Sequence, residues 1–92
     1  MTKYKVVATT VFKKDFKAIQ KRGYDLAKLK EVVEMLAEGT PLPERYRDHF
    51  LVGDYAGCRE CHIRPDWLLI YKISNDSVYL FLTRTGSHSD LF

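Results

Sequence analysis

The sequence predicts an α+β fold in which two helices pack on one face of a mainly antiparallel sheet, in the order β-α-α-β-β-β. Two observations predict it. Apolar residues recur at helical spacing in the first part of the chain, and three strand-like segments with short connections fill the last third. The 92 residues, 46% hydrophobic and 29% charged, are typical of one globular domain, expected to span residues 1–92.

The expected first strand leads directly into the first helix. Residues 4–9, YKVVAT, are rich in β-branched and aromatic side chains, which favours a strand. Thr9 or Thr10 then supplies an N-cap for a helix that begins at Val11, and Gly23 ends it. The apolar side chains of this helix recur with helical spacing and form one stripe: Phe12, Phe16 and Ile19.

A second helix is expected between Asp25, which suits the N-cap, and Gly39, which suits the C-terminal end. Its apolar stripe again has helical spacing: Leu26, Leu29, Val32, Val33 and Leu36. Residues 39–57 then carry two prolines and no clear hydrophobic period. A loop this long is unusual in a compact domain and is often functional.

Three strands are expected in the remainder of the chain, over Cys58–Ile63, Trp67–Ile73 and Val78–Arg84. The connections at residues 64–66 and 74–77 are short and have the composition of turns. Because short links join consecutive strands only when the strands run in opposite directions, we expect an antiparallel meander.

The charge is unevenly distributed along the chain. The net charge is +3, but residues 1–30 carry +7 and residues 31–92 carry −4. Part of this charge lies on the side of the first helix opposite its apolar stripe: Lys13, Lys14, Lys17 and Lys21. Two interpretations fit equally well, a polyanion partner bound through counterion release or a merely solvated helix face.

The two cysteines, Cys58 and Cys61, form a C-x-x-C pair, which occurs in redox motifs and in zinc sites. A second pair for a full zinc site is absent from the sequence. If the segment is a strand, residues three apart point to opposite faces and do not meet at one metal. We therefore expect packing cysteines and no metal site.

The sequence contains no apolar run near the roughly 20 residues that a membrane span needs, and its start lacks the long apolar region of a signal peptide. A cytoplasmic location and no membrane partner are the resulting expectations.

The alternation of the first meander strand places Glu60 and His62 on one face and its cysteine and isoleucine on the other. If the helices cover the second of these faces, Glu60 and His62 lie on the open one. Asp66 follows at the next turn, and His49 lies in the long loop. The tail that carries His88 leaves the last strand and is able to fold back over the same open face.

These groups suit the cleavage of RNA without a metal. A base takes the proton of the 2′-OH, an acid protonates the departing 5′-oxygen, and a cation stabilises charge at phosphorus. Histidine titrates near neutral pH, Arg84 is able to clamp phosphate bidentately, and Phe92 offers a ring for a base. The structural alternatives are surface histidines, an Arg84 that pairs with Asp66 or Glu60, and a Phe92 that plugs the core.

Two long strings carry a family resemblance: RDHFLVGDYAGCRECHIRPDWLLIYKI and RTGSHSDLF, supported by FKKDFK in the first helix. The chain resembles the YafQ branch of the RelE/YoeB toxins of type II toxin–antitoxin systems. The resemblance implies a microbial RNase fold and ribosome-dependent cleavage of mRNA in the A site. It also implies metal-independent chemistry without a cofactor, which leaves a 2′,3′-cyclic phosphate and a 5′-OH.

The resemblance also implies roles for individual residues. His88 is the expected general acid, and Asp66, with or without His62, is the expected base, although the opposite assignment stays open. His49 and Arg84 then bind the phosphate. Phe92 matches the closing aromatic of the family's tail. Glu60 stands where the family often has aspartate, which leaves the role of that residue open.

Partners follow from the same resemblance. The lysines of the first helix are expected to meet ribosomal RNA, positioning the enzyme on ribosome and mRNA without reading sequence. The cognate antitoxin is expected to be a DinJ-like ribbon-helix-helix protein, and operator DNA is contacted only through the toxin–antitoxin complex. The alternatives are a catalytically silent nucleic-acid or antitoxin-binding module on the same fold, and a zinc-binding domain.

Overall fold

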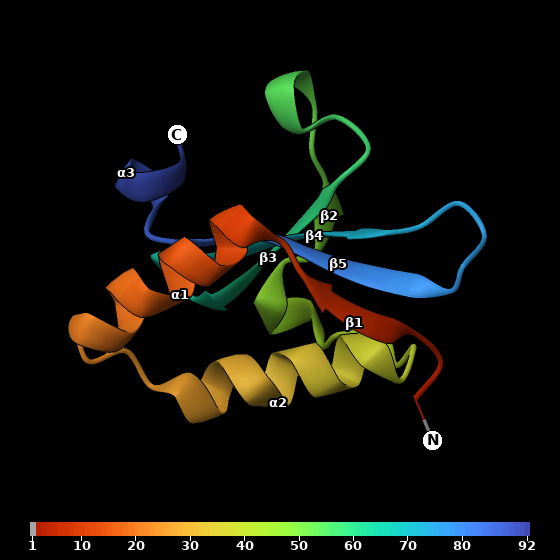
Figure 1. Ribbon diagram of the computed structural model, residues 1–92, viewed down its shortest axis with the longest axis horizontal. Helices are drawn as coiled ribbons and strands as arrows, with labels where there is room; N and C mark the ends of the chain where they lie inside the picture. Colours follow the sequence, from red (N-terminus) through yellow and green to blue (C-terminus); the bar gives the residue numbers. More distant parts are fainter. Residues whose placement is uncertain (1) are drawn as a thin grey trace.

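The computed structural model describes residues 2–92 and contains a five-stranded sheet in the order β1-β5-β4-β3-β2 (Figure 1). The elements, in chain order, are β1 (Lys5–Ala8), α1 (Thr10–Lys21), α2 (Leu26–Ala37), η1 (Glu44–Tyr46), β2 (His49–Phe50), η2 (Gly53–Tyr55), β3 (Arg59–Arg64), β4 (Trp67–Ile73), β5 (Tyr79–Gly86) and α3 (His88–Leu91).

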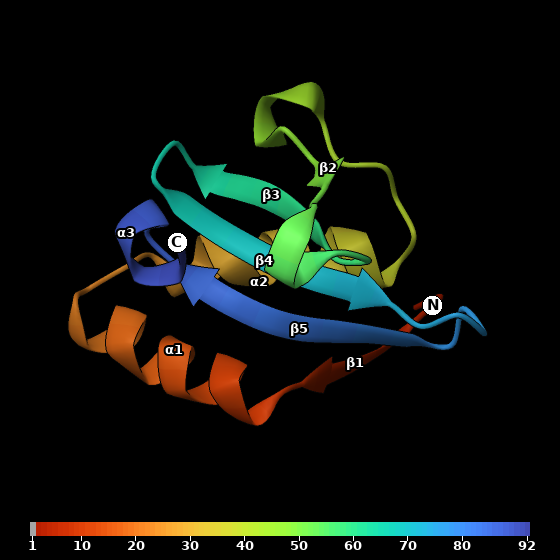
Figure 2. The same ribbon diagram turned by 90° about the horizontal axis from the view of Figure 1, so that it is seen from above.

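The predicted order of strands and helices is confirmed. Strands β3, β4 and β5 form the expected antiparallel meander, and β4 has the predicted bounds. Strand β1 pairs with β5 in parallel and forms one edge of the sheet, and β2 forms the other edge (Figure 2). The sheet is therefore mainly antiparallel.

Helix α2 begins directly after the predicted cap Asp25, and α1 begins at Thr10, one residue before the expected Val11, with Thr9 as its N-cap. The Thr9 hydroxyl accepts a hydrogen bond from the Phe12 N–H at 3.1 Å, and the Asp25 carboxylate accepts one from the Ala27 N–H at 3.2 Å. Each cap satisfies an N–H group that has no partner inside the helix. Both apolar stripes enter one core on a single face of the sheet, with buried side chains that include Ile19, Leu29, Val32, Cys61, Leu69 and Leu80.

A second, smaller apolar cluster lies on the opposite face of the sheet. Leu68 and Ile70 alternate with the core residues of β4, and Leu91 of α3 packs against them. Leu51, Tyr55 and Cys58 join the cluster at its border. The loop that carries η2 and the short helix α3 lie on this side, away from α2 (Figure 1). The face expected to be open is therefore partly covered.

Four short elements were not predicted. The long loop contains β2 and the two 3₁₀ turns, and the tail forms α3. A strand of two residues and a helix of four are too short to show a hydrophobic period. Helix α3 depends on a capping box, in which the Ser87 hydroxyl accepts the Asp90 N–H and the Asp90 carboxylate accepts the Ser87 N–H.

Within residues 2–92, none of the helices is both long enough and apolar enough to cross a membrane.

Candidate active site

Strand register aligns the predicted site residues in two rows across the sheet. Glu60 of β3 lies opposite Ile70 of β4, which lies opposite Arg84 of β5. His62 lies opposite Leu68, which lies opposite Gly86 at the root of the tail. Strands are about 4.8 Å apart, so the polar groups flank the Leu68–Ile70 floor at a separation of about 10 Å. The predicted folding of the tail over this face is confirmed, because Leu91 covers the floor.

The first polar group is a histidine–glutamate–histidine cluster. Pairing of β2 with β3 sets His49 opposite Glu60. The Nε2 atom of His49 lies 3.2 Å from Glu60 Oε2, and the Nε2 atom of His62 lies 3.7 Å from the same oxygen. The other oxygen, Oε1, is buried and accepts no hydrogen bond within residues 2–92. The two histidines are therefore the side chains that contact the Glu60 carboxylate.

Glu60 is more enclosed than the sequence predicted. Its side chain shares the face of Leu68 and Ile70, as alternation requires, but the residue is only 4% exposed. The expectation of an open position is wrong, because His49 on β2 and His62 pack against the carboxylate. A carboxylate buried to this degree is costly unless positive charge or a proton compensates it.

The contact of His49 with a backbone carbonyl indicates which ring nitrogen carries hydrogen. The Nδ1 atom of His49 lies 2.6 Å from the carbonyl oxygen of Arg47, which only accepts, so Nδ1 carries hydrogen. The Nε2 atom of the same ring faces the carboxylate oxygen of Glu60. An imidazolium at His49 would offer a hydrogen to each of these two acceptors.

The residue before His49 fixes the position of β2. One oxygen of Asp48, Oδ1, accepts hydrogen bonds from the Tyr71 hydroxyl at 2.6 Å and from Arg59 Nε at 3.1 Å. The Arg59 guanidinium also lies over the Phe50 ring, 4.2 Å from its centroid. Burial and the bond to Asp48 raise the pKa of the Tyr71 hydroxyl well above its ordinary value, so it stays a donor. This network makes Asp48 a positioning residue for His49.

The second polar group joins the β3–β4 turn to the tail. Asp66 Oδ1 accepts a hydrogen bond from the backbone N–H of His88 at 3.0 Å. The His88 ring stacks against Phe92 with centroids 5.2 Å apart, and Tyr55 meets Phe92 edge-on at 5.8 Å. Phe92 remains 59% exposed, so it does not plug the core and its ring is available to a partner.

The tail is fixed to α1 by an ion pair. Arg22 donates to Asp90 Oδ2 at 2.7 Å, and the same oxygen accepts the Ser87 N–H at 2.8 Å. The bond from Arg22, helped by the Ser87 N–H, lowers the pKa of Asp90 to about 2. Gly86 takes φ +155°, and a Cβ there would lie 2.9 Å from Asp90 Oδ2. Glycine is thus required where the tail turns.

Arg84 has a partner that the sequence did not reveal. Its Nε and Nη2 atoms donate to the two oxygens of Asp15 at 2.6 and 3.0 Å, and Nη1 donates to the Tyr55 hydroxyl at 3.3 Å. The alternative of a pair with Asp66 or Glu60 is therefore wrong. The bond to Asp15 raises the pKa of Arg84 and keeps it charged.

The four lysines of α1, Lys13, Lys14, Lys17 and Lys21, are exposed, and none forms an ion pair within the part of the chain that the structure describes. They lie on α1, whereas the histidines lie on β2, β3 and α3.

The two cysteines lie on opposite sides of the sheet, as alternation predicts. Cys61 is in the core under the helices, and Cys58 borders the smaller cluster. Burial raises the pKa of the Cys61 thiol, which disfavours the reactive thiolate. Within residues 2–92 no group of three or more histidine, cysteine, aspartate or glutamate side chains is arranged to hold a metal ion.

Sequence reasoning missed three polar residues of this face: Asp15, Asp48 and Tyr55. The first two position Arg84 and His49, and the third contacts both Arg84 and Phe92. The only available signal was that Asp15 is the one acid in FKKDFK and that Asp48 precedes His49 in the D-H motif.

Comparison with known proteins agrees with this geometry. A family model described as a bacterial toxin of type II toxin–antitoxin system, YafQ, matches residues 4–92. The mRNA interferase toxin YafQ of Escherichia coli K12 is 45% identical over 82 residues, covering 88% of this chain and 87% of that protein.

Solved structures agree as well. A chain of the E. coli DinJ–YafQ toxin–antitoxin complex is 40% identical with a TM-score of 0.88 and covers 98% of both chains. A metal-bound toxin from Helicobacter pylori is 44% identical with a TM-score of 0.89 over all of both chains.

Together the fold and the comparisons define a toxin of a type II toxin–antitoxin system. Within that class the chain belongs to the YafQ family, as the full-length match of the family model and the identity to the E. coli protein show.

Proposed function

We propose that this toxin is a ribosome-dependent endoribonuclease that cleaves mRNA in the A site and so stops translation. The observation that carries the proposal is the arrangement around the Leu68–Ile70 floor. The cluster of His49, Glu60 and His62 lies on one side, and the tail that carries His88, held by the Asp66 carboxylate of the β3–β4 turn, lies on the other. Its E. coli relative is named an mRNA interferase toxin.

The reaction is an in-line transfer at phosphorus. The base, Asp66 with or without His62, takes the proton of the 2′-OH, whose oxygen forms a new bond to the adjacent phosphorus. The bond from phosphorus to the 5′-oxygen breaks, and His88 donates its proton to that oxygen. The products are a 2′,3′-cyclic phosphate and a 5′-OH, so atoms and charge balance without a cofactor.

The remaining groups stabilise charge and position the substrate. His49, held by the Arg47 carbonyl and Glu60, lies at the edge of this face and binds the phosphate. Arg84 retains donor hydrogens beyond those that Asp15 and Tyr55 use, and these are its means of reaching a phosphate oxygen. Phe92 presents an exposed ring for base stacking.

The biological setting follows the same proposal. The antitoxin is a DinJ-like ribbon-helix-helix protein, by analogy with the E. coli complex, and operator DNA is bound only through the toxin–antitoxin pair. The site of action is the cytoplasm, where the ribosomes are. That residues 1–92 form a single domain stays a prediction.

The chemistry of the cut ends tests the proposal. Toxin freed of metal with EDTA and then passed to magnesium-containing programmed ribosomes should leave a 2′,3′-cyclic phosphate, detected by mass spectrometry of the upstream fragment. A 3′-hydroxyl, or activity that returns only when a transition metal is added back, would overturn the proposed reaction. A protein that binds antitoxin and ribosomes but cuts nothing would instead be the catalytically silent module.

A further inference from the structure

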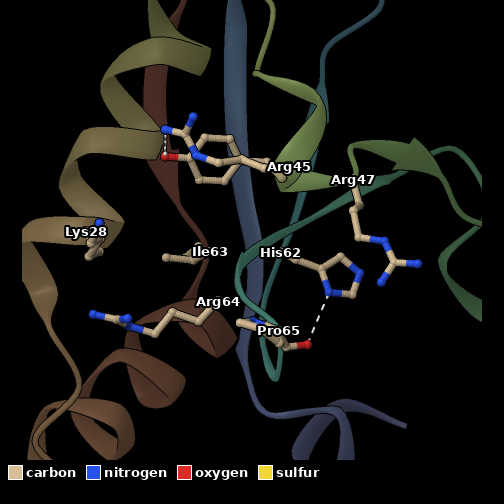
Figure 3. A pocket seen from close by; sticks show the side chains of 8 residues that line it. Lys28, Arg45, Arg47, His62, Ile63, Arg64 and Pro65 are labelled. Carbon is tan, nitrogen blue, oxygen red and sulfur yellow. Dashed lines mark hydrogen bonds between the residues drawn. The ribbon is translucent and has the colours of Figure 1, made fainter.

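A basic pocket of about 300 Å³ lies beside the candidate active site and shares His62 with it (Figure 3). Four cationic side chains line it, Lys28, Arg45, Arg47 and Arg64, and none of its lining residues is acidic. The cations come from α2, from the region of η1 and from the end of β3, so the fold alone brings them together.

The four cations differ in whether their side chains already have a partner in the protein. Arg45 is held by its neighbour, because it donates to the Tyr46 hydroxyl at 3.2 Å and lies over the ring at 4.7 Å. Arg64 lies 3.7 Å from Asp25, and both side chains are about half exposed, so this ion pair is weak. Within residues 2–92, the side chains of Lys28 and Arg47 make no ion pair and no hydrogen bond.

The backbone supports a specific role for Arg47. Its φ of +51° lies in the left-handed region, a backbone conformation that residues other than glycine rarely adopt. The same residue offers its carbonyl oxygen to His49 Nδ1. Arg47 therefore links the lining of the pocket to the histidine cluster, and in the view of Figure 3 its side chain extends on the side of His62 away from Lys28 and Arg64.

We propose that this pocket binds one phosphodiester group of RNA, next to the group that is cleaved; the proposal rests on the proposed function above. Four cations in one concave site, two of them without a side-chain partner within residues 2–92, suit a phosphate, and the planar guanidinium of arginine binds two of its oxygens at once. The shared His62 makes the pocket continuous with the reacting groups. Messenger RNA and ribosomal RNA both supply this chemistry.

The first test uses RNA without the ribosome. A 2′-O-methylated trinucleotide, which has no 2′ proton to lose, is titrated into the ¹⁵N-labelled toxin. Backbone signals of Arg47 and Arg64 should shift, and the Lys28→Gln/Arg47→Gln double variant should bind at least about tenfold more weakly, since two charge-assisted contacts are lost. Lys30→Gln, which removes a charge from the same helix outside the pocket, should bind as the wild type does.

The second test identifies the source of the phosphate. Ribosome affinity is measured against KCl concentration with and without mRNA in the A site. One lost phosphate contact flattens the salt slope of the double variant by about 0.7. A change that requires the A-site codon assigns the pocket to mRNA, and a change in both states assigns it to ribosomal RNA.

Three results overturn the proposal: no shift at Arg47 and Arg64, equal affinity of the double variant, or an equal loss in Lys30→Gln. These outcomes are separable from the proposed function. If the wild-type toxin cleaves mRNA but shows no shift, the phosphate site is rejected and the endoribonuclease proposal stands. If the toxin binds the trinucleotide in the pocket but never cuts mRNA on ribosomes, the endoribonuclease proposal is rejected and the phosphate site stands.

Discussion

Glu60 is the residue on which the geometry of the site depends most. Both histidine Nε2 atoms face one of its oxygens, and the residue is almost fully buried. His49 Nδ1 is committed to the Arg47 carbonyl, so a carboxylate at position 60 would stabilise an imidazolium form of this ring. We propose that Glu60 orients the two histidines and is therefore a positioning residue.

Replacing Glu60 by Gln should separate charge from shape. Glu60→Gln keeps the size but no longer holds an imidazolium, so cleavage should fall by at least about tenfold, a loss of about 1.4 kcal/mol at the transition state. Thermal stability should stay equal or rise, because a buried charge is removed. Single-turnover cleavage and thermal unfolding provide the readouts. Glu60→Asp is the matched control and should retain more activity; equal rates for wild type and Glu60→Gln would contradict the role.

Helix α3 holds residues 88–92 on the sheet beside the candidate site. Its capping box, its Leu91 and the Arg22–Asp90 pair hold it on the sheet, while Phe92 stays exposed. Stability and function are therefore separable within the last two residues.

Removing Phe92 should lower activity with little change in melting temperature, because its ring is mostly exposed. Leu91→Ala should instead cost about 2 kcal/mol of unfolding free energy, the low end for a buried leucine, because it packs in a small cluster. Denaturant unfolding and ribosome-dependent cleavage of both variants distinguish the two effects. A Phe92 deletion as unstable as Leu91→Ala would show that the ring supports the fold.

The attachment of α3 should depend on pH through Asp90. The Arg22 bond lowers the pKa of Asp90 to about 2. A carboxylate with a lowered folded-state pKa stabilises the folded state above its ordinary value of about 4, and the contribution is lost as pH falls towards 2. NMR signals of His88 and Leu91 should therefore report a docked helix at pH 5 that loosens between about pH 4 and 2. In Asp90→Asn the same signals should be loosened at every pH; a docked tail in that variant would argue against the pair.

Elements and contacts differ in how far the sequence predicts them. Alternation in β3 correctly separates Glu60 and His62 from Cys61, because a two-residue period is a local property. The bond between Arg84 and Asp15 joins residues 69 positions apart, and no local pattern encodes it. Strand β2 is fixed by the bond between Asp48 and Tyr71, and helix α3 by the packing of Leu91 on the sheet. Both elements are too short to show a hydrophobic period in the sequence.

At the scale of the molecule, positive charge occurs in two separate places, the lysines of α1 and the pocket beside His62. The catalytic candidates lie on the face opposite the helices, where the apolar floor separates the two groups. The lysines of α1 are thus apart from these candidates, whereas the pocket adjoins them through His62.

Reversing the charge of α1 tests the first of these surfaces. Lys13→Glu, Lys14→Glu and Lys17→Glu combined should weaken ribosome binding and flatten its dependence on salt, because fewer counterions are released. Binding by sedimentation at several KCl concentrations gives the slope. Since all three side chains are exposed, the fold should be unchanged by circular dichroism. An unaltered affinity would reduce this surface to a solvated helix face.

The central claim is that the tail histidine and the groups around the Leu68–Ile70 floor cut mRNA. The most direct measurement maps the ends of mRNA on programmed ribosomes after addition of the wild-type toxin or His88→Ala. We expect cleavage confined to the A site and a loss of about 10²–10⁴-fold in the variant, the usual contribution of a general acid. Equal cleavage by His88→Ala, or no cleavage by the wild type, would contradict it.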